Sequence, residues 1–423
     1  MRELEYPVIG EKLYTDTLPN GLRLFVCPKP GYTKSYAFFA TDYGGADRRF
    51  RLGDEWHDTP AGVAHFLEHK MFDMPDGNAL SVLSANGADP NAFTSSGITA
   101  YHFMSTEGFY ENLETLLTFV STPYFTEESV QKEQGIIGQE IRMVEDNPYY
   151  AVYYGLMQCL FAHNPMRESV AGTVESIAEI TPQTLYDCHA VFYNPSNMAL
   201  CVVGDVDAEK VREIALRILP AEAGERPVID YGETESGLPL CTRVEKQMDV
   251  SMPMFALGCG FPSALRGRAS LRQRVNAYLA LECMFGSSSP LFNRLYAEGL
   301  IDNSFGAEAE FTAGVGTVVI SGDSEDPEKV FEEVVREAER IGREGLDAGL
   351  FARIRRAAYG MRVRGLGRFG DLAYDLAASA FEGYQTLDAF SVIESATKEE
   401  AEKFIADTLR REALALSVVS RRE

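Results

Sequence analysis

Tryptophan, cysteine and histidine are all scarce in this chain of 423 residues, which has one Trp, seven Cys and six His. The cysteines are scattered, odd in number and never spaced as CxxC, which is not the pattern of a disulfide framework. We therefore expect reduced, mostly buried thiols. They are Cys27, Cys159, Cys188, Cys201, Cys241, Cys259 and Cys283.

Long apolar runs are absent as well. No stretch approaches the ~18 apolar residues that cross a membrane, and residues 1–21 carry charges without the apolar centre of a signal peptide. The remaining composition, 45% hydrophobic and 24% charged, is that of a globular protein, and the length of 423 residues favours two or three domains. We therefore expect a cytoplasmic protein with no membrane partner.

Basic residues are outnumbered, with 39 Lys and Arg against 63 Asp and Glu, for a net charge of −24. A charge of this sign repels phosphate backbones and anionic membrane surfaces, so nucleic acid is not an expected partner. Two explanations of the acidity stay open. It can simply keep the protein soluble, or it can steer basic peptides towards a binding site, which depends on where the charges lie.

The first half of the chain mixes hairpin strands with helices. Residues 13–26 predict a hairpin around the turn at 19–21, and residues 198–204 predict a buried strand. Apolar residues at helical spacing predict a helix over residues 63–71. This order favours an α+β fold with mostly antiparallel sheets flanked by helices.

The segment 221–240 is rich in Gly, Pro and Glu and has no periodicity, so it is predicted to link two domains, 1–220 and 241–423. The second half runs through a similar order of elements. A shift of 213 positions aligns His65, His69, Met71 and Phe72 with Tyr278, Glu282, Met284 and Phe285. The sequence thus predicts a duplicated scaffold whose second copy has lost its polar ligands.

The segment His65-Phe66-Leu67-Glu68-His69 carries the strongest chemical signal. Histidines at i and i+4 share one face of a helix and can reach the same metal ion. Glu68 stands beside that face, where a carboxylate can take a proton from the attacking water. The alternative is an ordinary surface helix with two histidines. His102, which alternates with aromatic residues on a predicted strand, favours packing over metal binding.

A catalytic zinc site with two histidines needs a third ligand. Glu133 and Glu140 are seven residues apart, and therefore on the same face of one predicted helix. Glu140 can serve as the ligand and Glu133 as a group that orients the site. From the spacing alone, a solvated helix face is the favoured explanation of the two carboxylates.

Together these features resemble the M16 family of inverted-motif zinc peptidases, which includes insulysin, pitrilysin and the mitochondrial processing peptidase. Four sequence segments show the resemblance: HxxEH at 65–69, Asn-Ala-Phe-Thr at 91–94, the segment from Glu133 to Glu140, and the stretch 193–205. The resemblance covers nearly the whole chain. Within the family, the chain is most similar to the two-domain bacterial branch, which includes the YmfH-like members. It implies two homologous domains of the LuxS/MPP-like metallohydrolase fold.

The resemblance also implies roles for individual residues. His65, His69 and Glu140 would bind one Zn²⁺ per chain, Glu68 would be the general base, and Glu133 would support the site.

A further group would bind substrate. Asn91, Ala92 and Phe93 would lie on an edge strand that pairs with the substrate backbone, as unpaired strand edges can do with extended peptides.

The expected function is therefore that of a zinc metalloendopeptidase acting on short or unfolded peptides in a chamber between the domains. One departure from the family pattern stands against it. Active members carry an Arg and a Tyr in the second domain, and here Tyr296 and Asp302 stand near those places, with Arg294 at the wrong spacing.

The departure keeps an alternative open, a noncatalytic or partner-dependent subunit. The expected assembly is a homodimer, or a heterodimer with a motif-poor paralogue that supplies the missing pair.

Overall fold

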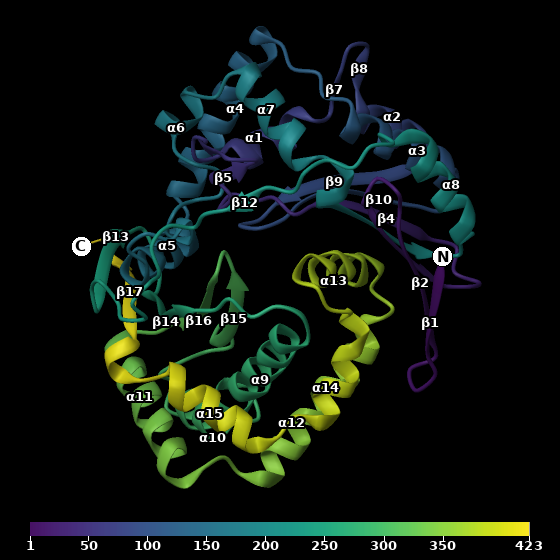
Figure 1. The fold of residues 1–423 in the computed structure, drawn as a ribbon. Helices are drawn as coiled ribbons and strands as arrows, with labels where there is room; N and C mark the ends of the chain where they lie inside the picture. Colours follow the sequence, from purple (N-terminus) through teal and green to yellow (C-terminus); the bar gives the residue numbers. More distant parts are fainter. Residues whose placement is uncertain (423) are drawn as a thin grey trace. The chain divides into compact units, whose positions relative to one another are not determined.

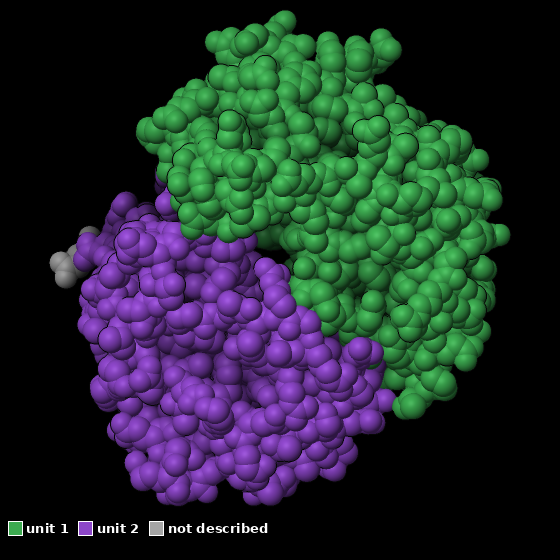
Figure 2. Space-filling view, in the orientation of Figure 1, with its two compact units in different colours: residues 1–141, 169–230, 363–387 green, residues 142–168, 231–362, 388–423 purple. Residues whose placement is uncertain are grey.

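The computed structural model describes residues 1–422, which form two compact units (Figure 1 and Figure 2). Neither unit is a continuous piece of chain. Unit 1 contains Met1–Ile141, Ser169–Asp230 and Val363–Leu387, and unit 2 contains Arg142–Glu168, Tyr231–Arg362 and the chain from Asp388 onward. The chain passes from unit 1 to unit 2 between Asp230 and Tyr231, inside the segment expected to link two domains. The compact units group residues that contact one another, whereas the predicted domains are continuous stretches of sequence. The domain bounds 1–220 and 241–423 therefore stay a prediction.

Unit 1 is built on a seven-stranded sheet in the order β1-β2-β3-β11-β4-β10-β9. Every neighbouring pair is antiparallel except β3 and β11, which are parallel. The strands are β1 (Arg2–Tyr6), β2 (Glu11–Thr17), β3 (Arg23–Pro28), β4 (Ser35–Thr41), β9 (Ala88–Thr94), β10 (Thr99–Ser105) and β11 (Met198–Gly204). All seven residues of β11 are buried, because helices cover both faces of the sheet there. The expected hairpin is confirmed by β2 and β3, and β9 is an edge strand.

One face of this sheet carries the main core, which also takes in buried residues of the helices on that side. These helices are α1 (Val63–Lys70), α2 (Ala79–Ala85), α3 (Phe109–Ser121), α4 (Glu127–Glu145), α6 (Val174–Ala178), α7 (Pro182–Phe192) and α8 (Ala208–Ile218). The opposite face is contacted by α13 (Phe369–Glu382) at β4 and β11 (Figure 1). Alternation along β4 explains both contacts: Phe39 points into the main core, while Phe38 lies against Tyr374 of α13.

Smaller elements complete unit 1. A three-stranded sheet is formed by β12 (Val228–Ile229), β5 (Arg49–Leu52) and β6 (Glu55–Asp58), and a two-stranded one by β7 (Asp73–Met74) and β8 (Gly77–Asn78). Short 3-10 helices lie at Pro195–Asn197 and Thr386–Asp388, and the second of them ends at Asp388, where the last segment of unit 2 begins.

Unit 2 repeats the central topology of unit 1. Its sheet has the order β13-β17-β14-β16-β15, with β13 and β17 parallel and the other pairs antiparallel. The strands are β13 (Arg243–Met248), β14 (Met254–Pro262), β15 (Gly306–Thr312), β16 (Val315–Asp323) and β17 (Ala415–Arg421). The same pattern links β3, β11, β4, β10 and β9 in unit 1, so the expected duplication extends to strand order and direction.

Seven helices belong wholly or mainly to unit 2. They are α5 (Pro148–Leu160), α9 (Gly267–Phe285), α10 (Pro290–Ala297), α11 (Pro327–Glu344), α12 (Ala348–Gly365), α14 (Ala389–Ser395) and α15 (Lys398–Thr408), with 3-10 turns at Pro165–Arg167 and Arg411–Ala413. Helix α5 packs on β13, β14 and β17. Helix α9 contains the positions that align with α1, and its Met284 and Phe285 are buried like Met71 and Phe72. Within residues 1–422, no helix combines the length and the apolar character needed to cross a bilayer.

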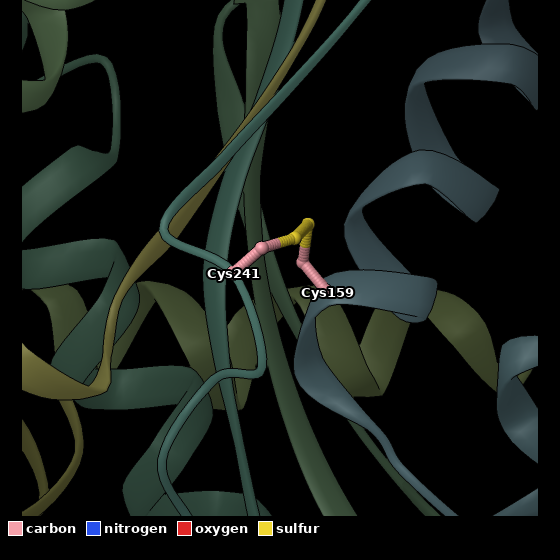
Figure 3. Close-up of a disulfide and its surroundings, with 2 residues drawn as sticks. All are labelled: Cys159 and Cys241. Atoms are coloured by element: carbon pink, nitrogen blue, oxygen red, sulfur yellow. A yellow bond between two sulfur atoms is a disulfide. The ribbon is translucent and has the colours of Figure 1, made fainter.

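The expectation that all seven cysteines are reduced is wrong. Cys159, at the end of α5, forms a disulfide with Cys241, which precedes β13 (Figure 3). The two positions are 82 residues apart, but the Leu240 N–H donates to the Cys159 carbonyl and holds their Cα atoms 5.0 Å apart. Spacing in the sequence carries no trace of this long-range pairing. The other five cysteines are free and buried, as expected.

Candidate metal centre

Helix α1 presents the HxxEH motif because its opposite side is anchored in the core. Phe66 and Leu67 are fully buried, whereas His65, Glu68 and His69 are only partly covered. The helix begins after Gly62, whose φ of 95° is disfavoured for residues with a side chain. A Cβ at Gly62 would lie 2.6 Å from the carbonyl oxygen of Ala171, so glycine also allows this close approach.

Helix α4 supplies the two carboxylates in the same manner. Val130, Ile137 and Ile141 are buried, and they leave Glu133 and Glu140 on the side that faces α1. The predicted helix and its carboxylate face are therefore present. The side chains of Glu133 and Glu140 are 16% and 34% exposed, so the solvated-face alternative does not describe them.

Three of the predicted residues converge on one point. His65, His69 and Glu140 offer ligand atoms that all lie within 4.8 Å of one another. Nε2 of His65 is 3.6 Å from Oε1 of Glu140, and Nε2 of His69 is 3.5 Å from Oε2 of the same carboxylate. Ligands at about 2.0–2.1 Å from a tetrahedral zinc ion lie roughly 3.4 Å apart. Two imidazoles and one carboxylate at this separation fit the donor set of a catalytic zinc site.

Glu133 holds His69 from the other side. Oε1 of Glu133 lies 3.0 Å from Nδ1 of His69, which leaves Nε2 directed at Glu140. Burial opposes protonation of His69, but the carboxylates of Glu133, Glu68 and Glu140 outweigh it and raise the pKa of His69. Burial likewise opposes ionisation of Glu133, yet the hydrogen bond to His69 lowers its pKa. Lys70 adds a buried positive charge 3.9 Å from Oε2 of Glu133.

The carboxylate of Glu140 is also kept ionised. The neighbouring imidazole of His65 is the main cause of the lowered pKa of Glu140, against a smaller opposing effect of burial. An anionic third ligand between two imidazoles favours a divalent cation.

Glu68 is directed towards the end of the edge strand. The hydroxyl of Thr94, the last residue of β9, donates to Oε2 of Glu68 over 2.8 Å. This contact links the candidate base to the strand that contains Asn91, Ala92 and Phe93. Ala92 packs against the main core, and the Phe93 ring lies on the other face of the sheet, near Phe38 and Tyr374.

The structure thus brings His65, Glu68, His69, Glu133 and Glu140 together, with the three edge-strand residues on β9. Sequence reasoning assigned no role to Thr94 or Lys70. Thr94 was part of a motif used for the resemblance, but only the contact between β9 and α1 reveals its hydrogen bond.

The second-domain departure is visible in unit 2. Arg294 on α10 is engaged in ion pairs, 2.7 Å from Oε2 of the buried Glu333 and 3.7 Å from Glu298. Tyr296 is exposed and stacks on Phe292, and Asp302 accepts a hydrogen bond from the Ser304 N–H.

Both halves of the chain are similar to known proteins. Residues 55–174 match the model of the insulinase family (peptidase family M16), and residues 179–358 match that of the peptidase M16 inactive domain. The uncharacterised zinc protease YmfH of Bacillus subtilis strain 168 is 36% identical over 99% of both chains.

Solved structures agree in fold. An M16-like peptidase from Alicyclobacillus acidocaldarius has a TM-score of 0.94 and 31% identity, with 99% of this chain and 100% of that chain covered. A chain of complex III2 from Candida albicans shares the fold alone, with a TM-score of 0.77 and 14% identity over 96% of this chain and 95% of that one. The whole-length identity to YmfH and the two family matches lead to one conclusion: this chain belongs to peptidase family M16.

Proposed function

We propose that this chain is a zinc-dependent endopeptidase that hydrolyses extended peptides, with Glu68 as general base. The observation that carries the proposal is the convergence of His65, His69 and Glu140 beside a carboxylate that is hydrogen-bonded to the edge strand β9. The names of relatives such as YmfH support zinc as the metal. One ion per chain follows from the single cluster found among residues 1–422.

The chemistry that zinc supplies when bound is polarisation of water and of the substrate carbonyl. His65, His69 and Glu140 would hold the ion, and Glu133 would keep the His69 ring in the orientation that directs Nε2 to the site. Glu68 would take the proton of the attacking water and return it to the leaving amine. The hydrogen bond from Thr94 would hold the carboxylate of Glu68 in place for both transfers.

The substrate would bind as an added strand on β9. Edge strands expose unpaired N–H and C=O groups, and β9 pairs only with β10 in its sheet. Because Thr94 ends β9 and contacts Glu68, a peptide along β9 passes close to the base. Folded proteins present few such extended segments, so short or unfolded peptides are the proposed substrates. Their enclosure in a chamber between the domains, which the family resemblance implies, stays a prediction.

The experiment is digestion of a library of unstructured peptides by the zinc-loaded chain and by its Glu68→Gln variant, read by mass spectrometry. We expect cuts by the wild type that vanish in the variant while both proteins retain equal zinc. Glu127→Gln, an exposed carboxylate at the start of α4, is the matched control and keeps full activity. Equal cleavage by wild type and Glu68→Gln would refute the proposal.

A second candidate is a subunit that is inactive alone. It is favoured by the engagement of Arg294 with Glu333, in a region where active family members carry substrate-gripping residues. In this proposal a motif-poor paralogue supplies the missing Arg and Tyr in a heterodimer. Zinc-loaded chain that cuts only when the paralogue is added supports it, and undiminished cutting by the chain alone refutes it. A cytoplasmic location remains part of the proposal, to be tested by fractionation.

A further inference from the structure

A cavity of about 500 Å³ lies within unit 1, on the sheet face opposite the main core. Its volume falls in the usual range for ligand sites, ~300–1,000 Å³. The sheet contributes Tyr36 and Phe38 from β4 and Phe93 from β9, and the start of α13 lines the other side. The residues from α13 and its first flank are Arg368, Gly370, Asp371, Tyr374 and Asp375.

One wall of the cavity is aromatic. The rings of Phe38, Phe93 and Tyr374 lie about equally far from one another, with centroids 6.0 Å apart for Phe38–Phe93 and Phe93–Tyr374 and 6.3 Å for Phe38–Tyr374. The Tyr36 ring stacks on His102, and its hydroxyl is 2.8 Å from Nδ1 of that histidine. Aromatic faces attract cations within ~6 Å of the ring centroid.

The other wall is acidic. Asp371 and Asp375 are one helical turn apart on α13, and Arg368 pairs with Asp371 at 2.8 Å. That ion pair is solvent-exposed, with side chains 71% and 59% exposed, so it contributes little and opens easily. Asp89 of β9 adds a further carboxylate nearby: burial first, then the charges of Asp371 and Asp89, raise the pKa of Tyr36 to about 12.

The balance of charge at the cavity is negative. The lining residues include two carboxylates, Asp371 and Asp375, and one guanidinium, Arg368. The beginning of α13 adds only about half a positive charge. Burial lowers the pKa of His102 to about 4, so this ring is neutral near pH 7 and does not offset the carboxylates.

We propose that this cavity is a subsite that receives a lysine or arginine side chain of a peptide bound along β9. The proposal rests on the proposed peptidase function and deepens it by naming the substrate class. Phe93 provides the connection, because it belongs to the edge strand and also lines the cavity. Side chains of an added strand alternate between the two sheet faces, so every second residue of the peptide lies on the same face as Phe93. The acidity of the chain, for which the composition left two explanations open, then includes a local steering role.

Binding is tested first, because it does not depend on turnover. Fluorescence anisotropy is measured for Glu68→Gln chain, loaded with zinc, with a labelled unstructured peptide that contains one lysine and with the same peptide carrying glutamine there. We expect about tenfold tighter binding of the lysine peptide, and a difference that shrinks as salt increases. Equal affinity for the two peptides would overturn the subsite.

Substitutions in the acidic wall test whether this cavity is the site that binds the lysine side chain. In the Glu68→Gln background, Asp371→Asn with Asp375→Asn is expected to remove the tenfold preference while binding of the glutamine peptide stays within about twofold. Asp54→Asn, in the exposed turn between β5 and β6, is the matched control and retains the preference. Because the glutamine peptide reports on folding, a preference that survives in the double variant overturns the assignment.

Cleavage by wild type separates this proposal from the function on which it rests. Cuts enriched for Lys or Arg at one position near the scissile bond support both. Cuts without basic enrichment overturn the subsite and leave the peptidase intact. An absence of cuts together with a lysine preference in binding refutes the peptidase and retains the subsite.

Discussion

Oε1 of Glu133 lies 3.0 Å from Nδ1 of His69, although the two residues are 64 positions apart and belong to different helices. The contact determines which nitrogen of His69 faces the metal centre, because Nδ1 is engaged and Nε2 is left towards Glu140. Partners of this kind raise ligand basicity and hold the ring in place.

Replacement of this partner should weaken the metal site. We expect Glu133→Gln to reduce zinc affinity about 10–100-fold, measured by competition with a chromogenic chelator. Glu127→Gln on the same helix is the control. Unchanged affinity in Glu133→Gln would show that the contact is not needed to orient His69.

Thr94 is expected to act as a positioning residue for Glu68. Thr94→Val removes the 2.8 Å hydrogen bond and should lower kcat about tenfold while KM and zinc content stay nearly constant. Thr94→Ser retains the hydroxyl and should recover most of the activity. If Thr94→Val raised KM alone, Thr94 would instead contribute to substrate binding.

The start of α1 depends on glycine. Gly62→Ala places a methyl group 2.6 Å from the Ala171 carbonyl oxygen, at a φ of 95°. We expect this variant to lower the unfolding free energy by about 2–4 kcal/mol and to weaken zinc binding. Gly53 also has positive φ but has no heavy atom within 4 Å of the position of a Cβ. Gly53→Ala should therefore cost about 1 kcal/mol and leave zinc binding unchanged, as denaturation and metal titration can test.

The Cys159–Cys241 bond should stabilise unit 2. Because it closes a long loop between positions 82 residues apart, Cys241→Ser is expected to lower the unfolding free energy by about 2–5 kcal/mol. Reductant should bring the wild type to the level of the variant and leave the variant unchanged. Alkylation of the denatured wild type checks the pairing: five cysteines should react without reductant and seven with it.

Acid should destabilise the protein through two histidines, of which His189 is buried and His102 partly buried. Burial lowers the pKa of both His102 and His189 to about 4, below the usual ~6.5. Between these values the unfolded chain binds protons that the folded chain does not, so the unfolding free energy falls as pH falls from about 6.5 to 4.

In this pH range, each of these two histidines changes the unfolding free energy by about 1.4 kcal/mol per pH unit. Denaturation curves of His102→Gln, measured at several pH values, should show a pH dependence of the unfolding free energy that is smaller by the contribution of one histidine. His163→Gln, at a histidine whose side chain is 49% exposed, is the control substitution. An unchanged slope in His102→Gln would contradict a neutral His102 in the folded protein.

Local periodicity carries much of the candidate site. The i, i+4 spacing of His65 and His69 and the seven-residue spacing of Glu133 and Glu140 predict which side chains share a helix face, and each pair does. A helix turns by a constant angle per residue, so this information needs no tertiary structure. The order of strands and helices also predicts the α+β class and the duplicated scaffold.

Contacts between distant segments could not be predicted in this way. Thr94 meets Glu68 because β9 packs beside α1, and Cys241 meets Cys159 because a strand passes the end of α5. The cavity depends on α13, which follows β11 by more than 150 residues and still packs on it.

The residue pattern alone therefore establishes which faces of the elements are apolar, which carry ligands, and that those ligands suit zinc. Tertiary structure alone decides which element covers each face, and with it the partner of Glu68, the disulfide and the acidic cavity. The physical reason is that the hydrophobic effect is non-directional. An apolar face in the sequence indicates that some segment must cover it, but does not indicate which segment. Only the folded chain, in which α13 and β9 meet across one sheet face, makes that choice.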